Sequence, residues 1–254
     1  MMTPEFLRSR HSVRRFSSRP IEPATANAVK AAITMVNTHE AGMHFELITD
    51  DSTPFEGFKA SYGMFHGVRN YICAVADISF PDAQERAGYF AEQIVMKCVE
   101  LGLGTCFVGG TYDQSRVKTV LRVDRRILFI IALGYAEEKQ QTFLSGLAMK
   151  MAHRHDRQPE DFFVATEAMD FAEACRRLPW LENGLKGLAS APSALNKQPV
   201  RIRPARDAEG NLTVAASAEG GEKTLVDLGI GKYNFGQAAD GEWDWGNGGL
   251  FYKT

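Results

Sequence analysis

The chain has 254 residues, of which 44% are hydrophobic and 24% are charged, as in ordinary globular proteins of one large domain or two half-sized units. The formal net charge of −2 lacks the basic excess of a general nucleic-acid-binding protein. The longest apolar run, Ile127 to Leu133, is too short to span a bilayer, and the N-terminus lacks the apolar core of a signal peptide. We therefore expect neither nucleic-acid nor membrane binding.

The possible metal ligands and disulfide partners are few. The four cysteines are widely spaced and include no Cys-x-x-Cys pair, which is typical of small buried hydrophobic residues in a reducing compartment. This pattern predicts a cytoplasmic protein. His153 and His155 are not accompanied by carboxylates or cysteines in a ligand pattern, so we expect a solvated linker there and no metal site. The cysteines are Cys73, Cys98, Cys106 and Cys175.

A basic segment (residues 10–16, Arg-His-Ser-Val-Arg-Arg-Phe) follows a short helix that we expect to run from Thr3 to Arg8. If the segment is extended, alternate side chains project to one side together. Arg10, Ser12 and Arg14 then offer forked guanidinium donors and a hydroxyl to a phosphate-bearing ligand. The alternative is a solvated basic stretch that ends a helix, and the segment alone favours this alternative.

Hydrophobic periodicity and glycine signals predict the elements that follow in the first half. A long helix at 83–101, with a broad apolar face, stops at Gly102-Leu-Gly104 and leads into an extended piece that closes on Gly109-Gly110. Further helices are expected at 24–35 and 113–121, and strands at 44–49, 71–76 and 126–135.

A polar stretch, residues 137–161, reads as the connection to a second half. That half is predicted to contain helices at 161–177 and 181–188, a hairpin of strands 200–203 and 212–217, and a last helix opening at Asp227. Between helix and hairpin lies the Pro-Ser loop (residues 191–199, Ala-Pro-Ser-Ala-Leu-Asn-Lys-Gln-Pro). The Gly- and Trp-rich tail carries Trp243, Trp245 and Tyr252, which either line a ligand slot or, as we favour, pack in the core or at an interface.

The two halves form a weak internal repeat. The sequence beginning at Asn27 matches the sequence beginning at Asn183, and the same offset places the strand at His44 on the strand at Val200. The first half lacks a counterpart of the Pro-Ser loop, and the second half lacks a counterpart of the basic segment. Each half therefore keeps what the other has lost.

Three motifs together resemble the FMN-dependent nitroreductase family: the basic segment, the Pro-Ser loop, and the long helix leading to Gly-Leu-Gly-x-Cys106. The chain is similar to the subset of this family that fuses two halves into one pseudo-dimeric chain, although the Pro-Ser loop here follows the long helix instead of preceding it. The resemblance implies an α+β fold, a central mainly antiparallel sheet flanked by helices, with tandem half-repeats. It implies halves at 1–150 and 151–254, packed as one compact unit, in a monomer or weak homo-oligomer.

The resemblance also implies one composite FMN site per chain, assembled from both halves, and one degenerate site. Arg10, His11 and Ser12 would hold the phosphate and ribityl chain, and Arg14 would lie near N1 and O2 of the ring. A backbone N–H of Gly109 or Gly110 would reach N5, and Lys139 would supply a second phosphate cation. If the motifs are considered separately, an ordinary turn at Pro192 and a loop hinge at the paired glycines remain alternatives. The residues expected at the ring edge are Pro192, Ser193 and Asn196.

The function implied is an NAD(P)H oxidoreductase. Hydride would pass from NADH or NADPH to flavin N5 and then to a nitro compound, quinone or similar small acceptor in the same slot, without an acid–base dyad or nucleophile. A fixed cation near N1 would stabilise the reduced flavin. A flavin-binding carrier or sensor without turnover is the alternative, and a structural protein with a decayed site is the third possibility.

Overall fold

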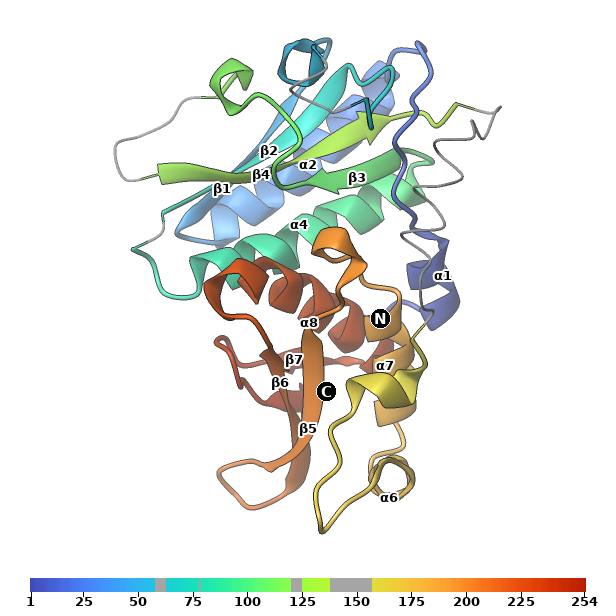
Figure 1. The fold of residues 1–254 in the computed structure, drawn as a ribbon, viewed down its shortest axis with the longest axis vertical. Helices are drawn as coiled ribbons and strands as arrows, with labels where there is room; N and C mark the ends of the chain where they lie inside the picture. The colour runs from blue at the N-terminus through green and yellow to red at the C-terminus, as the bar shows by residue number, and fades with distance from the viewer. Residues whose placement is uncertain (58–62, 78, 120–124, 138–156) are drawn as a thin grey trace. The chain divides into compact units, whose positions relative to one another are not determined.

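The structure, a computed structural model, describes residues 1–57, 63–77, 79–119, 125–137 and 157–254. The chain divides into two compact units (Figure 1). Residues 10–139 form the sheet unit, and residues 1–9 together with 140–254 form the hairpin unit. The domain boundary expected at residue 150 lies outside the described residues and stays a prediction.

A four-stranded antiparallel sheet, in the order β1-β2-β4-β3, organises the sheet unit. β4 lies between β2 and β3, as expected for a central strand, and β2 is buried along nearly its whole length. The predicted antiparallel sheet is thus confirmed, with strand ends that differ from expectation by a few residues. The strands are β1 (Met43–Ile48), β2 (Asn70–Asp77), β3 (Gly104–Val108) and β4 (Arg125–Gly134).

Helices α2 (Pro23–His39) and α4 (Ala83–Glu100) pack against this sheet and against each other (Figure 1). Val29, Ile33 and Val36 are buried along α2, at the spacing of one helix face. A separate core cluster includes Val13 and Phe16 of the basic segment together with alternate side chains of β2. The basic segment therefore contributes to the core of this unit. Short 3₁₀ turns lie at η1 (Thr53–Phe55) and η2 (Gln114–Arg116).

The hairpin unit is built on the pair α7 (Leu181–Ala189) and α8 (Leu225–Ala239). The helices approach closely because Gly187 has no side chain: a Cβ there would lie 2.4 Å from the backbone oxygen of Asn234. The predicted hairpin is present as β5 (Val200–Arg206) and β6 (Leu212–Ala218), closed by a bond from Asp207 N to Asn211 O. The other elements are α1 (Pro4–Ser9), η3 (Pro159–Phe162), α6 (Phe171–Arg177), η4 (Ala194–Asn196) and η5 (Gly221–Thr224).

The Gly- and Trp-rich tail forms two short strands that the sequence did not predict, β7 (Gly241–Trp243) and β8 (Phe251–Lys253). Trp243 is buried, and its ring centroid lies 5.1 Å from that of Phe235 and 5.0 Å from that of Phe251. The core-packing interpretation therefore holds for Trp243. Tyr252 is exposed, and its hydroxyl donates to Asp244 Oδ2.

Two predicted helices were wrong. A helix was expected at 113–121, of which residues 113–119 are described. There the chain makes the short η2, because Asp113 Oδ1 accepts from Ser115 N and Tyr71 Oη accepts from Lys118 N. In place of a continuous helix at 161–177, η3 is followed by extended chain, since Val164 N donates to Ile202 O of β5. The helix α6 starts only at Phe171. Tertiary hydrogen bonds thus override helical periodicity in both places.

Candidate functional site

The basic segment is extended and is fixed to the edge strand β3. Ser12 forms a parallel bridge with Thr105, and Val13 N donates to Thr105 O at 2.9 Å. This approach requires a glycine at Gly104, where a Cβ would lie 2.7 Å from Val13 Cγ2. Helix α1 ends before the segment, at Ser9. The alternative of a basic helix end is therefore wrong.

The basic segment lies near the buried thiol of Cys106 on β3, and Arg10, Ser12 and Arg14 all affect the pKa of this thiol. Burial raises the pKa of the Cys106 thiol. The charges of Arg14 and Arg10 and a hydrogen bond with Ser12 oppose this rise in pKa. The extended backbone of the segment is the conformation in which alternate side chains project to one side, so the shared side of Arg10, Ser12 and Arg14 stays a prediction.

Arg10 is withdrawn from solvent. Its side chain is 8% exposed, and its Nε lies 3.9 Å from Oε1 of Glu92 on α4, whose side chain is fully buried. Within the described part of the chain, Nε and Nη1 of Arg10 have no hydrogen-bond partner. Leaving buried charged donors without an acceptor is costly. An anionic ligand would supply the missing acceptor, so Arg10 fits a phosphate-binding role. His11 beside it is exposed.

The paired glycines follow β3 directly, so they belong to the same edge of the sheet unit as the basic segment. Gly109 and Gly110 are exposed, and a Cβ built on either would have no described atom within 4 Å. The packing of the described chain therefore does not require glycine at these positions. The space beside their backbone is open to a group from outside the chain, such as a planar ring. Lys139 lies outside the described residues, as do His153 and His155.

The Pro-Ser loop of the hairpin unit is held in an unusual backbone conformation. Leu195, Asn196 and Gln198 have positive φ angles of 54°, 52° and 46°, which are rare for residues other than glycine. Ser193 secures the loop, because its Oγ accepts from Gln198 N at 2.8 Å and its backbone oxygen accepts from Asn196 N at 3.0 Å. Backbone strain of this kind is concentrated at functional sites in proteins.

Asp227 is a residue of this site that sequence reasoning missed. It lies in the first turn of α8, and its two carboxylate oxygens accept from Ala194 N at 3.1 and 3.3 Å. Burial raises the pKa of Asp227 to about 6, opposed by the bond from Ala194 and the charge of Lys197. The sequence signal for its burial is a carboxylate inside an apolar helix run, Leu225-Val-Asp-Leu-Gly-Ile.

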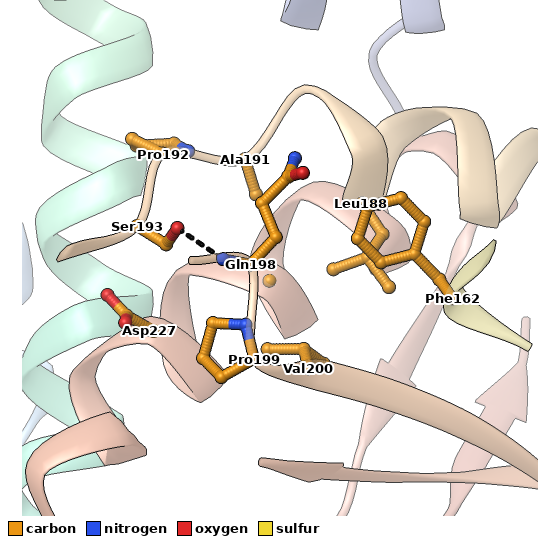
Figure 2. A pocket seen from close by; sticks show the side chains of 10 residues that line it. Phe162, Leu188, Ala191, Pro192, Ser193, Gln198, Pro199, Val200 and Asp227 are labelled. Atoms are coloured by element: carbon orange, nitrogen blue, oxygen red, sulfur yellow. Dashed lines mark hydrogen bonds between the residues drawn. The ribbon is translucent and has the colours of Figure 1, made fainter. Parts of the chain in front are cut away.

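Between this loop and α8 lies a small hollow, with Pro192 and Ser193 among its lining residues. Figure 2 shows the polar groups of Ser193 and Asp227 on one side and the apolar side chain of Phe162 on the other. Asn196 is exposed and does not line the hollow. The lining residues are Phe162, Leu188, Ala191, Pro192, Ser193, Gln198, Pro199, Val200, Asp227 and Gly231.

The expected site residues thus fall into two groups in different units. Arg10, Ser12 and Arg14 belong to the basic segment of the sheet unit, near Cys106. Pro192, Ser193 and Asn196 belong to the strained loop of the hairpin unit. Among the described residues, no helix has the length and apolar character needed to cross a bilayer.

Comparison with known proteins gives a family and a fold. The family model described as "Putative TM nitroreductase" matches residues 3–239. A solved structure of a "putative nitroreductase" from Thermotoga maritima MSB8 is 21% identical, with a TM-score of 0.60, and the match covers 99% of this chain and 92% of that one. This likeness shows a shared nitroreductase-like fold across nearly the whole chain.

Shorter solved structures match part of the chain. An FMN-dependent nitroreductase from Clostridium difficile R20291 is 20% identical, with a TM-score of 0.41, over 54% of this chain and 90% of that one. A nitroreductase family protein from Streptococcus pneumoniae TIGR4 is 16% identical, with a TM-score of 0.41, over 54% and 92%. No curated protein matches the chain.

Proposed function

Because the chain belongs to the nitroreductase family described as "Putative TM nitroreductase", we propose that it is an FMN-dependent oxidoreductase. It takes hydride from NADH or NADPH and passes it to a nitro compound, a quinone or a similar small acceptor. The observation that carries this proposal is the extended basic segment, in which the buried side chain of Arg10 has donors without a hydrogen-bond partner among the described residues.

The basic segment suits the anionic end of FMN. Arg10 would bind the phosphate through donors that lack an acceptor among the described residues, and His11 and Ser12 would bind the phosphate and ribityl oxygens. Arg14 would place its charge near N1 and O2 of the ring. A fixed guanidinium there favours the reduced, negatively charged ring and so raises its reduction potential.

Other groups would bind the ring itself. The open backbone at Gly109 or Gly110 would donate an N–H at N5, and Lys139 would add a second cation at the phosphate. Pro192, Ser193 and Asn196 would contribute contacts at the ring edge, from a loop whose conformation is fixed in advance. The complementary motifs of the two halves support one FMN per chain, with contributions from both halves, and a pseudo-dimeric origin.

When bound, FMN supplies the two-electron acceptor and donor that the side chains of the protein lack. The protein's own contribution is to bind and orient the reactants, to place a positive charge near N1, and to limit access of water. This account requires no nucleophile and no acid–base pair.

The test is a spectrum of the purified full-length protein loaded with FMN. Anaerobic addition of NADH or NADPH should bleach the flavin absorbance, and a nitroarene should restore it. Bound flavin that neither nucleotide bleaches would instead identify a carrier or sensor, and a protein that takes up no FMN would contradict the proposal.

The role proposed for Arg14 is tested by the variant Arg14→Ala. Arg15→Ala is its matched control, because the side chain of the neighbouring Arg15 donates to Glu137 Oε2 at 2.9 Å.

A further inference from the structure

Two arginines of the hairpin unit converge on one backbone carbonyl at the end of the Pro-Ser loop. Arg157 Nη1 donates to the oxygen of Gln198 at 3.2 Å, and Arg201 Nη1 donates to the same oxygen at 2.8 Å. Arg201 Nη1 also donates to Val200 O at 2.8 Å. The shared acceptor holds two positively charged groups close to each other.

Within the described ranges of the chain, no ion pair neutralises these two charges. Among the residues that the structure describes, neither guanidinium has a carboxylate within 4.0 Å. Asp161 lies nearby, but its Oδ2 accepts from Gln158 N at 2.8 Å. Burial and then repulsion from Arg157 lower the pKa of Arg201, and the charges of Glu219 and Asp161, each with a smaller effect than Arg157, oppose this.

Both guanidinium groups keep donors for a ligand. Nε and Nη2 of Arg157 and of Arg201 make no hydrogen bond to the described part of the chain, and both residues are half-buried. The Arg157 guanidinium lies 6.0 Å from the centroid of the Phe162 ring, which restricts its position. Such donors, already held near each other, bind an anion with little loss of conformational freedom.

The carbonyl between them is held firmly. Gln198 has a positive φ, its N donates to Ser193 Oγ, and its Nε2 donates to Ala189 O at 3.2 Å. These bonds fix the direction of the carbonyl and thereby the place where the two arginines meet.

We propose that Arg157 and Arg201 bind a phosphate dianion through their remaining N–H groups. Guanidinium forks match the spacing of phosphate oxygens, and two adjacent cations match two negative charges, whereas a single carboxylate would neutralise only one. The phosphate has two possible sources, free inorganic phosphate or a phosphate ester such as the 2′-phosphate that distinguishes NADPH from NADH. The second source rests on the proposed function, and the phosphate site itself does not.

The proposal is tested by isothermal titration calorimetry on the full-length protein, in phosphate-free buffer at constant ionic strength. The probes are inorganic phosphate, adenosine 2′-monophosphate and adenosine 5′-monophosphate. We expect Arg157→Gln and Arg201→Gln each to weaken phosphate binding about tenfold. The variant Arg201→Lys should lie between wild type and Arg201→Gln, because it keeps the charge and loses the fork.

Arg203→Gln is the matched control, since Arg203 is exposed two residues further along β5, and its effect should stay below twofold. The absence of phosphate binding in the wild type, or an equal loss in Arg203→Gln, would overturn the proposal. Tighter binding of the 2′-ester than of the other probes identifies a nucleotide source, and equal binding of all three identifies a general phosphate site. FMN content and bleaching by NADH, measured on the wild-type protein in phosphate-free buffer, test the proposed function separately, because neither readout requires the added phosphate probe.

Discussion

The guanidinium of Arg10 lies 3.9 Å from the carboxylate of Glu92, and both side chains are withdrawn from solvent. The pair connects the basic segment to α4 inside the sheet unit. Its geometry leaves two Arg10 donors without an acceptor among the described residues. The pair therefore positions the Arg10 cation and leaves two of its hydrogen-bond donors without an acceptor among the described residues. This arrangement is expected of a group that binds an anionic ligand.

Glu92→Gln should destabilise the protein by about 3 kcal/mol, because removing one member of a buried ion pair leaves an uncompensated charge. The measurement is urea unfolding of the flavin-free protein, followed by circular dichroism. Glu100→Gln on the same helix is the control, since Glu100 is exposed and its loss should cost less than about 0.5 kcal/mol. Equal losses in the two variants would show that the buried pair has no special role.

Arg14→Ala should weaken FMN binding about tenfold and lower the reduction potential of the bound flavin by about 30 mV, because a fixed positive charge near the reduced ring is lost. Fluorescence titration gives the affinity, and redox titration against a reference dye gives the potential. Arg15→Ala should change neither quantity, because its side chain is engaged by Glu137. An unchanged potential in Arg14→Ala would remove the role assigned to this arginine.

The ionisation of Asp227 should make stability depend on pH. Burial raises its pKa in the folded protein from 3.8 to about 6, so the folded state holds a proton that the unfolded chain releases near pH 4. The stability gained from this proton is complete below pH 4 and is lost as the pH rises through 6, by about 3 kcal/mol.

Asp227→Asn should therefore be more stable than the wild type at pH 8, and the difference should vanish below about pH 3.5, where the carboxyl is protonated in both states. Urea unfolding at the two pH values measures it. The control is Glu160→Gln, because Glu160 is exposed on η3. Its replacement should change the free energy of unfolding by the same amount at both pH values. If Asp227→Asn is less stable than the wild type at pH 8, burial does not disfavour the ionised carboxylate of Asp227.

Leu195→Gly separates backbone strain from packing in the Pro-Ser loop. Leu195 has φ 54° and ψ 25° and is 88% exposed. Glycine at this position relieves about 1 kcal/mol of left-handed backbone strain. It also loses more conformational entropy on folding, which costs a similar amount. The variant should match wild-type stability within about 0.5 kcal/mol.

Lys197→Gly provides the comparison, because Lys197 has an ordinary φ of −72° and gains no such relief. It should lose about 1 kcal/mol. Equal losses in the two glycine variants, measured by thermal unfolding, would mean that Leu195 is not strained.

Local sequence patterns predicted the sheet unit well. Strands β1, β2 and β4 carry alternating or continuous apolar runs, and α4 has an apolar face that ends at a glycine. The alternation in the basic segment likewise predicted an extended conformation, and the bridge between Ser12 and Thr105 confirms it. These features depend on neighbours in the sequence.

Features that depend on distant partners were missed. The helix expected at 161–177 is interrupted where Val164 pairs with Ile202 on β5. Asp227 binds Ala194 across a gap of 33 residues, and nothing in the local sequence identifies that partner. The positive φ angles of the Pro-Ser loop are also set by tertiary bonds, since Leu195 and Gln198 are residues that seldom adopt them.

The central claim, one FMN per chain bound by the basic segment and the Pro-Ser loop, is tested most directly by counting bound flavin. The measurement is a titration of flavin-free protein of known concentration with FMN, followed by quenching of flavin fluorescence. We predict an endpoint at one FMN per chain. An endpoint at two FMN per chain, or no saturable binding, would contradict the account.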